Sequence, residues 1–397
     1  MLNFDFGDGE DSMSVEMSGK RLKFLDASKG IASFLVVLGH VIQSGLSMIE
    51  NGSPFDNVVY RIIYSFHMPL FMCVSGYFFY DTMKKGIKYV IMNRVSSLLV
   101  LLLFWNTIHY VCVLLIRMIS HEKISFSLNE YRNELFQGYW FLWAIMLYAL
   151  VVGIGARIFR ERFQALGILM MTPIILISPV RWVAITQFFY FLVGFFIKKE
   201  CNKATDRARW RGINAATVRW GLLVLLIILE CIYLRTDALG IGAVKDWLDA
   251  VIVSVKSNDF RSICRECGEL LLFYGMGITG SITVILWFRH FEQSGYDVLM
   301  KVFGKLGRYS LQIYILQRIF VELISTKAYM SFVTQLGRNP LLSNLNLFTY
   351  VWSVLLTIFW LLLLYFVSSN IMKTAIGKML LTGKVYRVDS NYVQSAK

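Results

Sequence analysis

Charged residues are scarce in this chain, and their scarcity excludes an ordinary soluble domain. Asp, Glu, Lys and Arg make up 17% of the 397 residues, whereas 56% are hydrophobic. Soluble domains carry about one quarter charged residues. Apolar runs of roughly 18 or more residues recur along the chain, which is the length a helix needs to cross a bilayer. The composition therefore predicts an all-α, polytopic membrane helix bundle.

Three further absences narrow the class. The six cysteines are scattered, and the C-x-x-C of Cys264 and Cys267 has no second pair or nearby histidine, so we expect neither a disulfide framework nor a metal site. The chain has a net charge of +14, but its basic residues lie between apolar runs and not along one soluble face. We therefore expect no nucleic-acid partner. The N-terminal segment lacks the apolar core and cleavage site of a removable signal peptide.

Apolar segments predict about ten transmembrane helices. The predicted spans are 29–49, 58–80, 95–118, 139–158, 164–180, 182–198, 219–235, 268–288, 306–325 and 348–368. Most Lys and Arg residues lie in alternate loops, and short basic loops stay cytoplasmic, so both termini are expected to face the cytoplasm. Residues 1–24 and 371–397 are then cytoplasmic tails, and 25–370 form the transmembrane domain.

The loops between the spans carry two further signals. We expect basic clusters such as "KKGIKYVIMNR" to fix the topology and to contact anionic lipid. Binding of a cytosolic polyanion is the alternative role for these clusters. The longest outer loops are 119–138 and 236–267. The second contains "VKDWLDAVIVSV", whose pattern predicts an amphipathic helix.

The first predicted span carries a histidine near its centre. In "LDASKGIASFLVVLGH", Lys29 and His40 are three helical turns plus about 20° apart, so they share one face, about 16 Å apart along the axis. Asp26 lies one turn below Lys29. The second span brings His67 to a similar depth, and Pro69 frees a carbonyl near it. Buried histidines often only pack, but a matched pair on consecutive spans favours proton handling.

Other polar groups inside the predicted spans are interpreted as structural. Asn106, His109 and Gln187 suit hydrogen bonds between helices. Arg318 needs a partner at membrane depth, and Glu322, one turn further along, is the expected one.

Acyl transfer to a hydroxyl would use this arrangement. An alcohol is a poor nucleophile at neutral pH, so a general base such as histidine must take its proton. An acyl thioester of coenzyme A carries phosphates, which Lys and Arg at cytoplasmic helix ends would hold. The alternative is a transporter or lipid-linked-sugar translocase with proton-coupled histidines, although the two related halves typical of transporters are not detected.

The sequence resembles the acyltransferase-3 family of integral membrane acyltransferases. "LDASKGIASFLVVLGH" is similar to the first helix of that family, and "FHMPLFMCVSGYFF" is similar to its second helix. "YWFLWAIMLY", "FFYFLVGFFIKK" and "FGKLGRYSLQIYILQ" resemble later helices in the right order. The likeness runs from about residue 21 to about residue 370.

The resemblance implies a membrane O-acyltransferase that moves acetyl from cytosolic acetyl-CoA to a hydroxyl of a cell-surface polysaccharide or its lipid-linked precursor. His40 would be the catalytic base with His67 beside it, Lys29 its basic partner, and Arg94 a donor-binding residue. Asp26 would orient Lys29. Acetyl-CoA is then a co-substrate and no cofactor is tightly bound. Lipid is the other partner, the expected location is the bacterial inner membrane, and the oligomeric state is left open.

Two departures from the family pattern shift the expected roles. Many members have two arginines three residues apart at the third helix, whereas this chain has Arg94 and then Ser97. Anchoring of coenzyme A is therefore also expected from Lys84, Lys85 and Lys88. Many members have histidine where this chain has Gln317, which leaves Gln317 a hydrogen-bond donor in place of an acid or base. Further candidates to line the acceptor path are Ser75, Tyr77 and Tyr314. Some relatives carry a fused hydrolase-like domain, and transfer is expected to proceed here without it.

Overall fold

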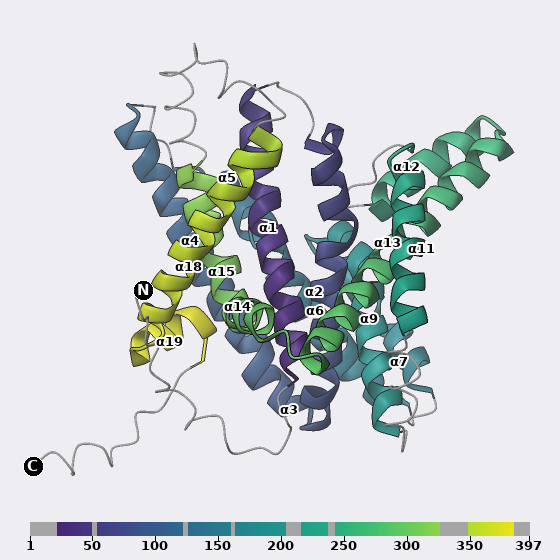
Figure 1. Cartoon of the computed structure of the whole chain (residues 1–397), viewed down its shortest axis with the longest axis horizontal. Helices are drawn as coiled ribbons and strands as arrows, with labels where there is room; N and C mark the ends of the chain where they lie inside the picture. Colours follow the sequence, from purple (N-terminus) through teal and green to yellow (C-terminus); the bar gives the residue numbers. More distant parts are fainter. Residues whose placement is uncertain are drawn as a thin grey trace, which may run out of the picture.

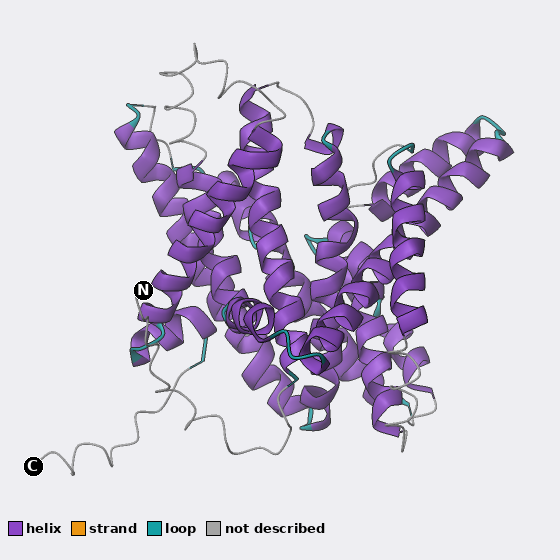
Figure 2. Cartoon of the chain, in the orientation of Figure 1, coloured by secondary structure: helices purple, strands orange, loops and turns teal. Residues whose placement is uncertain are grey.

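The computed structural model describes residues 22–49, 54–121, 126–159, 163–203, 216–236, 243–325 and 348–384. Within these ranges the chain is helical with short turns and has no strand (Figure 2). Eight helical segments there are long and apolar enough to cross a membrane. The predicted all-α polytopic helix bundle is thus confirmed.

The eight long segments follow the sequence prediction closely. They are Lys23–Gly45, Val58–Lys84, Ile87–Ile119, Trp140–Ile158, Arg181–Asn202, Ala216–Tyr233, Phe260–Gln293 and Tyr350–Ile371. The elements behind them are α1 (Lys23–Ile49), α2 (Val58–Lys84), α3 (Ile87–Val90), η2 (Ile91–Val95), α4 (Ser96–Ile119), α6 (Trp140–Ile158), α9 (Arg181–Lys203), α11 (Ala216–Tyr233), α13 (Phe260–Gln293), η5 (Phe348–Trp352) and α18 (Ser353–Ile371). The shorter elements are η1 (Pro54–Asp56), α5 (Leu128–Gln137), α7 (Gln164–Met171), α8 (Pro173–Leu176), α12 (Ala243–Lys256), α14 (Asp297–Arg308), α15 (Ser310–Gln317), η4 (Arg318–Ser325) and α19 (Ala375–Thr382).

Two of the ten predicted spans are shorter than predicted. In the segment 164–180, α7 ends at Met171 and Pro173 begins α8, because proline starts a helix well and cannot continue one. In the segment 306–325, the basic amphipathic α14 ends at Arg308, and a new helix begins at Ser310 and continues into η4. Residues 326–347, which follow η4, lie outside the described ranges.

The connecting elements gather at two ends of the bundle (Figure 1). The short elements α3 and α19 lie in the lower half of the view, at the end where α1 begins. The elements α5 and α12 lie in the upper half. These groups match the loops predicted to be cytoplasmic and external, respectively, so the sequence-based orientation assigns the lower end to the cytoplasm.

The most buried part of the bundle forms around α1, α2, α6 and α9. Their inward faces join one continuous hydrophobic core with parts of α4, α15 and α18. By contrast, α11 and α18 expose large apolar side chains, including Ile227, Ile228, Phe359 and Leu362. An exposed apolar belt of this kind suits contact with lipid.

Glycine pairs set how closely the inner helices approach. A side chain at Gly30 of α1 would collide with the carbonyl of Phe303, and one at Gly307 of α14 would collide with the carbonyl of Asp26. The backbones of α1 and α14 are therefore in direct contact, which is how small residues bring membrane helices together. This contact holds the lower end of α1, with Asp26 and Lys29, against α14.

Two predicted loops and the predicted C-terminal tail contain packed helices. The segment 119–138 contains α5, whose N-cap Ser127 accepts from the backbone N–H of Glu130. The amphipathic helix predicted in 236–267 is confirmed as α12, and α13 already begins in that loop at Phe260. The tail from 371 includes α19, where the indole of Trp105 donates to the carbonyl of Leu380 at 2.8 Å. The segment 1–24 lies almost wholly outside the described ranges.

Candidate active site

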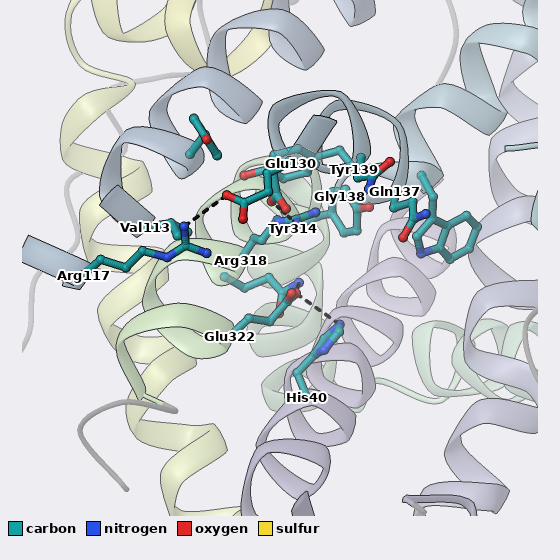
Figure 3. A pocket seen from close by; sticks show the side chains of 15 residues that line it. His40, Val113, Arg117, Glu130, Gln137, Gly138, Tyr139, Tyr314, Arg318 and Glu322 are labelled. Atoms are coloured by element: carbon teal, nitrogen blue, oxygen red, sulfur yellow. Dashed lines mark hydrogen bonds and ion pairs between the residues drawn. The ribbon is translucent and has the colours of Figure 1, made fainter. Parts of the chain in front are cut away.

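Two pockets extend into the bundle from its two ends. The upper pocket, of about 480 Å³, lies beneath α5 and next to η4 (Figure 3). It is lined by His40, Tyr110, Val113, Arg117, Glu130, Asn133, Glu134, Gln137, Gly138, Tyr139, Trp140, Tyr314, Gln317, Arg318 and Glu322. The lower pocket, of about 630 Å³, starts at the lower end of α1. Its polar lining consists of Asp26, Lys29, Ser75, Tyr77, Asp81, Thr82, Arg94, Lys198, Ser310 and Tyr314.

His40 lies in the upper pocket and faces a carboxylate. Its Nε2 is 3.5 Å from Oε1 of Glu322, a contact that Figure 3 draws. The side-chain amide of Gln317 donates to the same carboxylate oxygen at 2.9 Å. Gln317 is therefore a hydrogen-bond donor at the site, and the carboxylate that it holds is directed at the imidazole.

The winding of η4 accounts for the contact between Gln317 and Glu322. η4 is a π-helix, whose wider turn brings residues five apart close together, and Glu322 follows Gln317 by five residues. The predicted Arg318–Glu322 pair is wrong, because Arg318 contacts a different carboxylate.

Arg318 instead pairs with Glu134 of α5. Its Nη2 donates to Oε1 of Glu134, and its guanidinium lies 5.0 Å from the ring centre of Tyr139. Nδ1 of His109 is 2.6 Å from the same carboxylate oxygen. Burial raises the pKa of Glu134, but the His109 contact and the Arg318 charge outweigh it and hold that pKa below its usual range. His109 and Arg318 together fasten α5 over the upper pocket.

The remaining charges of the upper pocket lie nearer its rim. Nη1 of Arg117 is 3.0 Å from Oε2 of Glu130, and both side chains are substantially exposed. Asn133, Gln137 and Trp140 complete this part of the wall. The pocket therefore offers many hydrogen-bonding groups together with an aromatic ring.

The lower pocket combines three cations with two carboxylates. Nζ of Lys29 is 2.9 Å from Oδ1 of Asp26, and Nζ of Lys198 is 3.3 Å from Oδ2 of Asp81. Arg94 contacts the hydroxyl of Thr82 at 3.4 Å, and no carboxylate lies within ion-pair distance of it among the described residues. A pocket with this balance of charge is suited to an anion.

The structure brings together most of the predicted site residues, in two groups. Asp26, Lys29, Ser75, Tyr77 and Arg94 line the lower pocket, whereas His40 and Gln317 line the upper one. Tyr314 lines both.

Lys29 lines the lower pocket and His40 the upper one, three turns of α1 and about 16 Å apart along the axis, which is the spacing expected from the sequence. The role of Lys29 as basic partner of His40 stays a prediction.

Four predicted residues line neither pocket. His67 is 2% exposed, and its Nδ1 is 2.6 Å from the carbonyl of Ile63 on its own helix. Lys84, Lys85 and Lys88 are exposed on the surface. Lys84 and Lys85 lie over the rings of Tyr80 and Tyr89, respectively. A catalytic role of His67 and donor anchoring by these three lysines stay predictions.

Sequence reasoning missed several lining residues. Lys198 is the first of the two lysines that end the segment "FFYFLVGFFIKK", and it was not assigned to a site, although a lysine at a cytoplasmic helix end is the signal used for Lys29. Glu322 was assigned only as a partner of Arg318. Glu134 lies in a predicted loop, where an acidic residue carries no signal of its own.

The match to known sequences decides the class of protein. The family model for an acyltransferase domain covers residues 22–366. The chain belongs to the acyltransferase-3 family. It is thus a multi-pass membrane protein with an acyltransferase domain, and the transporter alternative is not carried further.

Two curated relatives also match part of the chain. It is 34% identical over 137 residues to the nodulation protein NolL of Sinorhizobium fredii, which is 34% of this chain and 36% of that protein. It is 30% identical over 142 residues to the NolL of Mesorhizobium japonicum, which is 35% of this chain and 37% of that protein. The match thus spans little more than a third of these relatives. No solved structure matches the chain significantly.

Proposed function

We propose that this acyltransferase transfers an acetyl group from cytosolic acetyl-CoA to a hydroxyl of a cell-surface polysaccharide or its lipid-linked precursor. The observation that carries the proposal is the His40–Glu322 pair in a pocket that meets, at Tyr314, a second pocket lined by three cations. In the predicted orientation the lower pocket faces the cytoplasm of a bacterial inner membrane, and the upper pocket faces outward.

The lower pocket would take the phosphates of the donor. The guanidinium of Arg94, which lacks a carboxylate partner among the described residues, would bind phosphate oxygens as a fork. Lys29 and Lys198 would add point charges, and Asp26 holds Lys29 in place at 2.9 Å. The thioester would then lie deeper in the pocket, towards Tyr314.

His40 would act as the general base. With Nε2 directed at Glu322, Nδ1 is the ring nitrogen left to accept the proton of the acceptor hydroxyl. The hydroxyl oxygen forms a C–O bond to the thioester carbonyl carbon, and the C–S bond breaks. The proton passes from the imidazolium to the leaving sulfur, which gives free coenzyme A and an ester. Glu322 stabilises the positive charge that His40 carries in between.

The upper pocket suits a sugar acceptor. The carboxylate of Glu130 and the amides of Asn133 and Gln137 offer acceptors and donors for hydroxyl groups. The indole of Trp140 offers an aromatic face with a polar edge. A hydroxyl held by these groups would lie in the same pocket as His40.

The test is a comparison of wild type, His40→Ala and His290→Ala in detergent. His290 lies near the end of α13 outside both pockets, so His290→Ala is the matched control. The first readout is thermal stabilisation by acetyl-CoA, and the second is release of free coenzyme A with and without added glycan.

We expect all three proteins to be stabilised and only His40→Ala to lose release, by about 10²- to 10⁴-fold. If no acyl-CoA stabilises the wild type, the donor assignment is wrong. If His40→Ala releases coenzyme A at the wild-type rate, His40 is not the base.

A further inference from the structure

We infer that Tyr314 forms an aromatic partition between the two pockets and limits the length of the acyl group that the enzyme transfers. This inference rests on the proposed function, because it concerns the path of the acyl group from the lower to the upper pocket. Among the residues that line the two pockets within the described ranges, Tyr314 is the one that both share.

Helix geometry places the meeting point of the pockets at Tyr314. On α1, Val36 lines the lower pocket and His40, one turn further along, lines the upper pocket. On α15, Leu311 lines the lower pocket and Gln317 lines the upper one, with Tyr314 between them. The thioester carbon must therefore pass the level of Tyr314 to come within reach of His40.

Contacts on several sides hold the Tyr314 ring in this place. Its centre is 5.2 Å from the ring centre of Phe141 and 6.0 Å from that of Tyr139. Phe141 stands in the first turn of α6, so this contact sets the ring against the start of that helix. Tyr139 is fixed in turn, because its hydroxyl donates to the carbonyl of Ile315 at 3.0 Å.

The lower side of the partition is apolar and closed by bulky side chains. Phe71 lies 5.8 Å from Phe141, centre to centre, and Met68 and Leu142 line the same deep part of the lower pocket. A two-carbon acyl group adds little volume at this point. Each additional methylene would have to displace an aromatic ring that is packed against two others, and packed interiors resist such insertion.

The experiment measures the ratio of butyryl-CoA turnover to acetyl-CoA turnover in wild type, Tyr314→Ala, Tyr314→Phe and Phe141→Ala. The ratio is internal to each preparation, so a smaller folded fraction does not change it. Tyr314→Phe keeps the ring and removes the hydroxyl, and Phe141→Ala opens the same wall from the other side.

We expect a low ratio in wild type and a rise of about tenfold or more in Tyr314→Ala, because a methylene in an apolar pocket is worth about 10- to 200-fold in discrimination. Phe141→Ala should raise the ratio as well, and Tyr314→Phe should leave it near the wild-type value.

The inference is overturned if wild type uses both donors equally well, or if the ratio stays unchanged in both alanine variants while acetyl-CoA is still consumed. In either case the proposed function stands. If wild type consumes neither donor, the proposed function fails and the inference fails with it.

Discussion

Removing the charge of Glu322 should slow turnover without weakening donor binding. Glu322→Gln keeps the shape of the side chain and its contact with Gln317, and it removes the negative charge that lies 3.5 Å from Nε2 of His40. That charge matters most when His40 carries the acceptor's proton, so its loss raises the barrier to transfer and leaves the lower pocket unchanged.

The distance sets the expected magnitude. Two unit charges 3.5 Å apart attract by about 1 kcal/mol in bulk water and by about 5 kcal/mol at an effective dielectric constant of about 20. The side chains of His40 and Glu322 are 23% and 32% exposed, so solvent screens the pair and the lower part of that range applies. About 1–3 kcal/mol corresponds to a decrease in kcat of roughly 5- to 150-fold.

The assay follows coenzyme A release at saturating acetyl-CoA, together with thermal stabilisation by acetyl-CoA. Glu269→Gln is the matched control, because Glu269 lies on α13 outside both pockets. A Glu322→Gln enzyme that turns over as fast as the control would refute the stabilising role of Glu322. A Glu322→Gln enzyme that no longer binds acetyl-CoA would refute the separation of the two pockets.

Three further predictions concern other parts of the molecule. Arg94→Ala should raise the KM for acetyl-CoA about tenfold, since a hydrogen bond to a charged group is worth about 1.5–3 kcal/mol. Its kcat should stay within about threefold of the wild-type value, and an unchanged KM would remove Arg94 from the donor site. The lowered pKa of Glu134 makes its ion pairs stabilising above the usual carboxyl range, and this stabilisation is lost as the pH falls from that range through the lowered pKa. The difference in melting temperature between wild type and Glu134→Gln should thus be full at pH 7 and shrink as the pH falls below about 4, and a difference that stays equal over this range would contradict this. The predicted membrane orientation can be tested in intact cells with an impermeant maleimide and two single-cysteine proteins. The reagent should label the protein that retains Cys264, which is exposed near the start of α13, and should not label the one that retains Cys201, near the end of α9. The reverse labelling pattern would invert the orientation.

Local periodicity predicted the parts of the site that lie on straight helices. Lys29, Asp26 and His40 share a face of α1 because every residue between them has ordinary α-helical spacing, and the structure places them along one line through both pockets. Ser75 and Tyr77 of α2 were predicted as lining residues of the acceptor path, and they line the lower pocket instead. Depth along a helix is readable from sequence, but which pocket a side chain enters depends on its neighbours.

The parts that were not predicted depend on irregular backbone or on contacts between distant segments. The π-helical winding of η4 brings Glu322 next to Gln317, and no periodicity rule anticipates that. The pairs Glu322–His40 and Arg318–Glu134 join segments that are distant in the sequence. Glu134 reaches the site because α5, in a predicted loop, folds over the upper pocket. His67 matched His40 in depth, but its imidazole is directed at a carbonyl of its own helix.

The most direct measurement is a cryo-electron microscopy map of His40→Ala with bound acetyl-CoA. If the acetyl group passes between the two pockets, density for the phosphates will contact Arg94 and Lys198, and the thioester will lie against Tyr314 on the side facing residue 40. Density for the phosphates at the exposed Lys84 and Lys85, or a thioester remote from Tyr314, would contradict the assignment of both pockets.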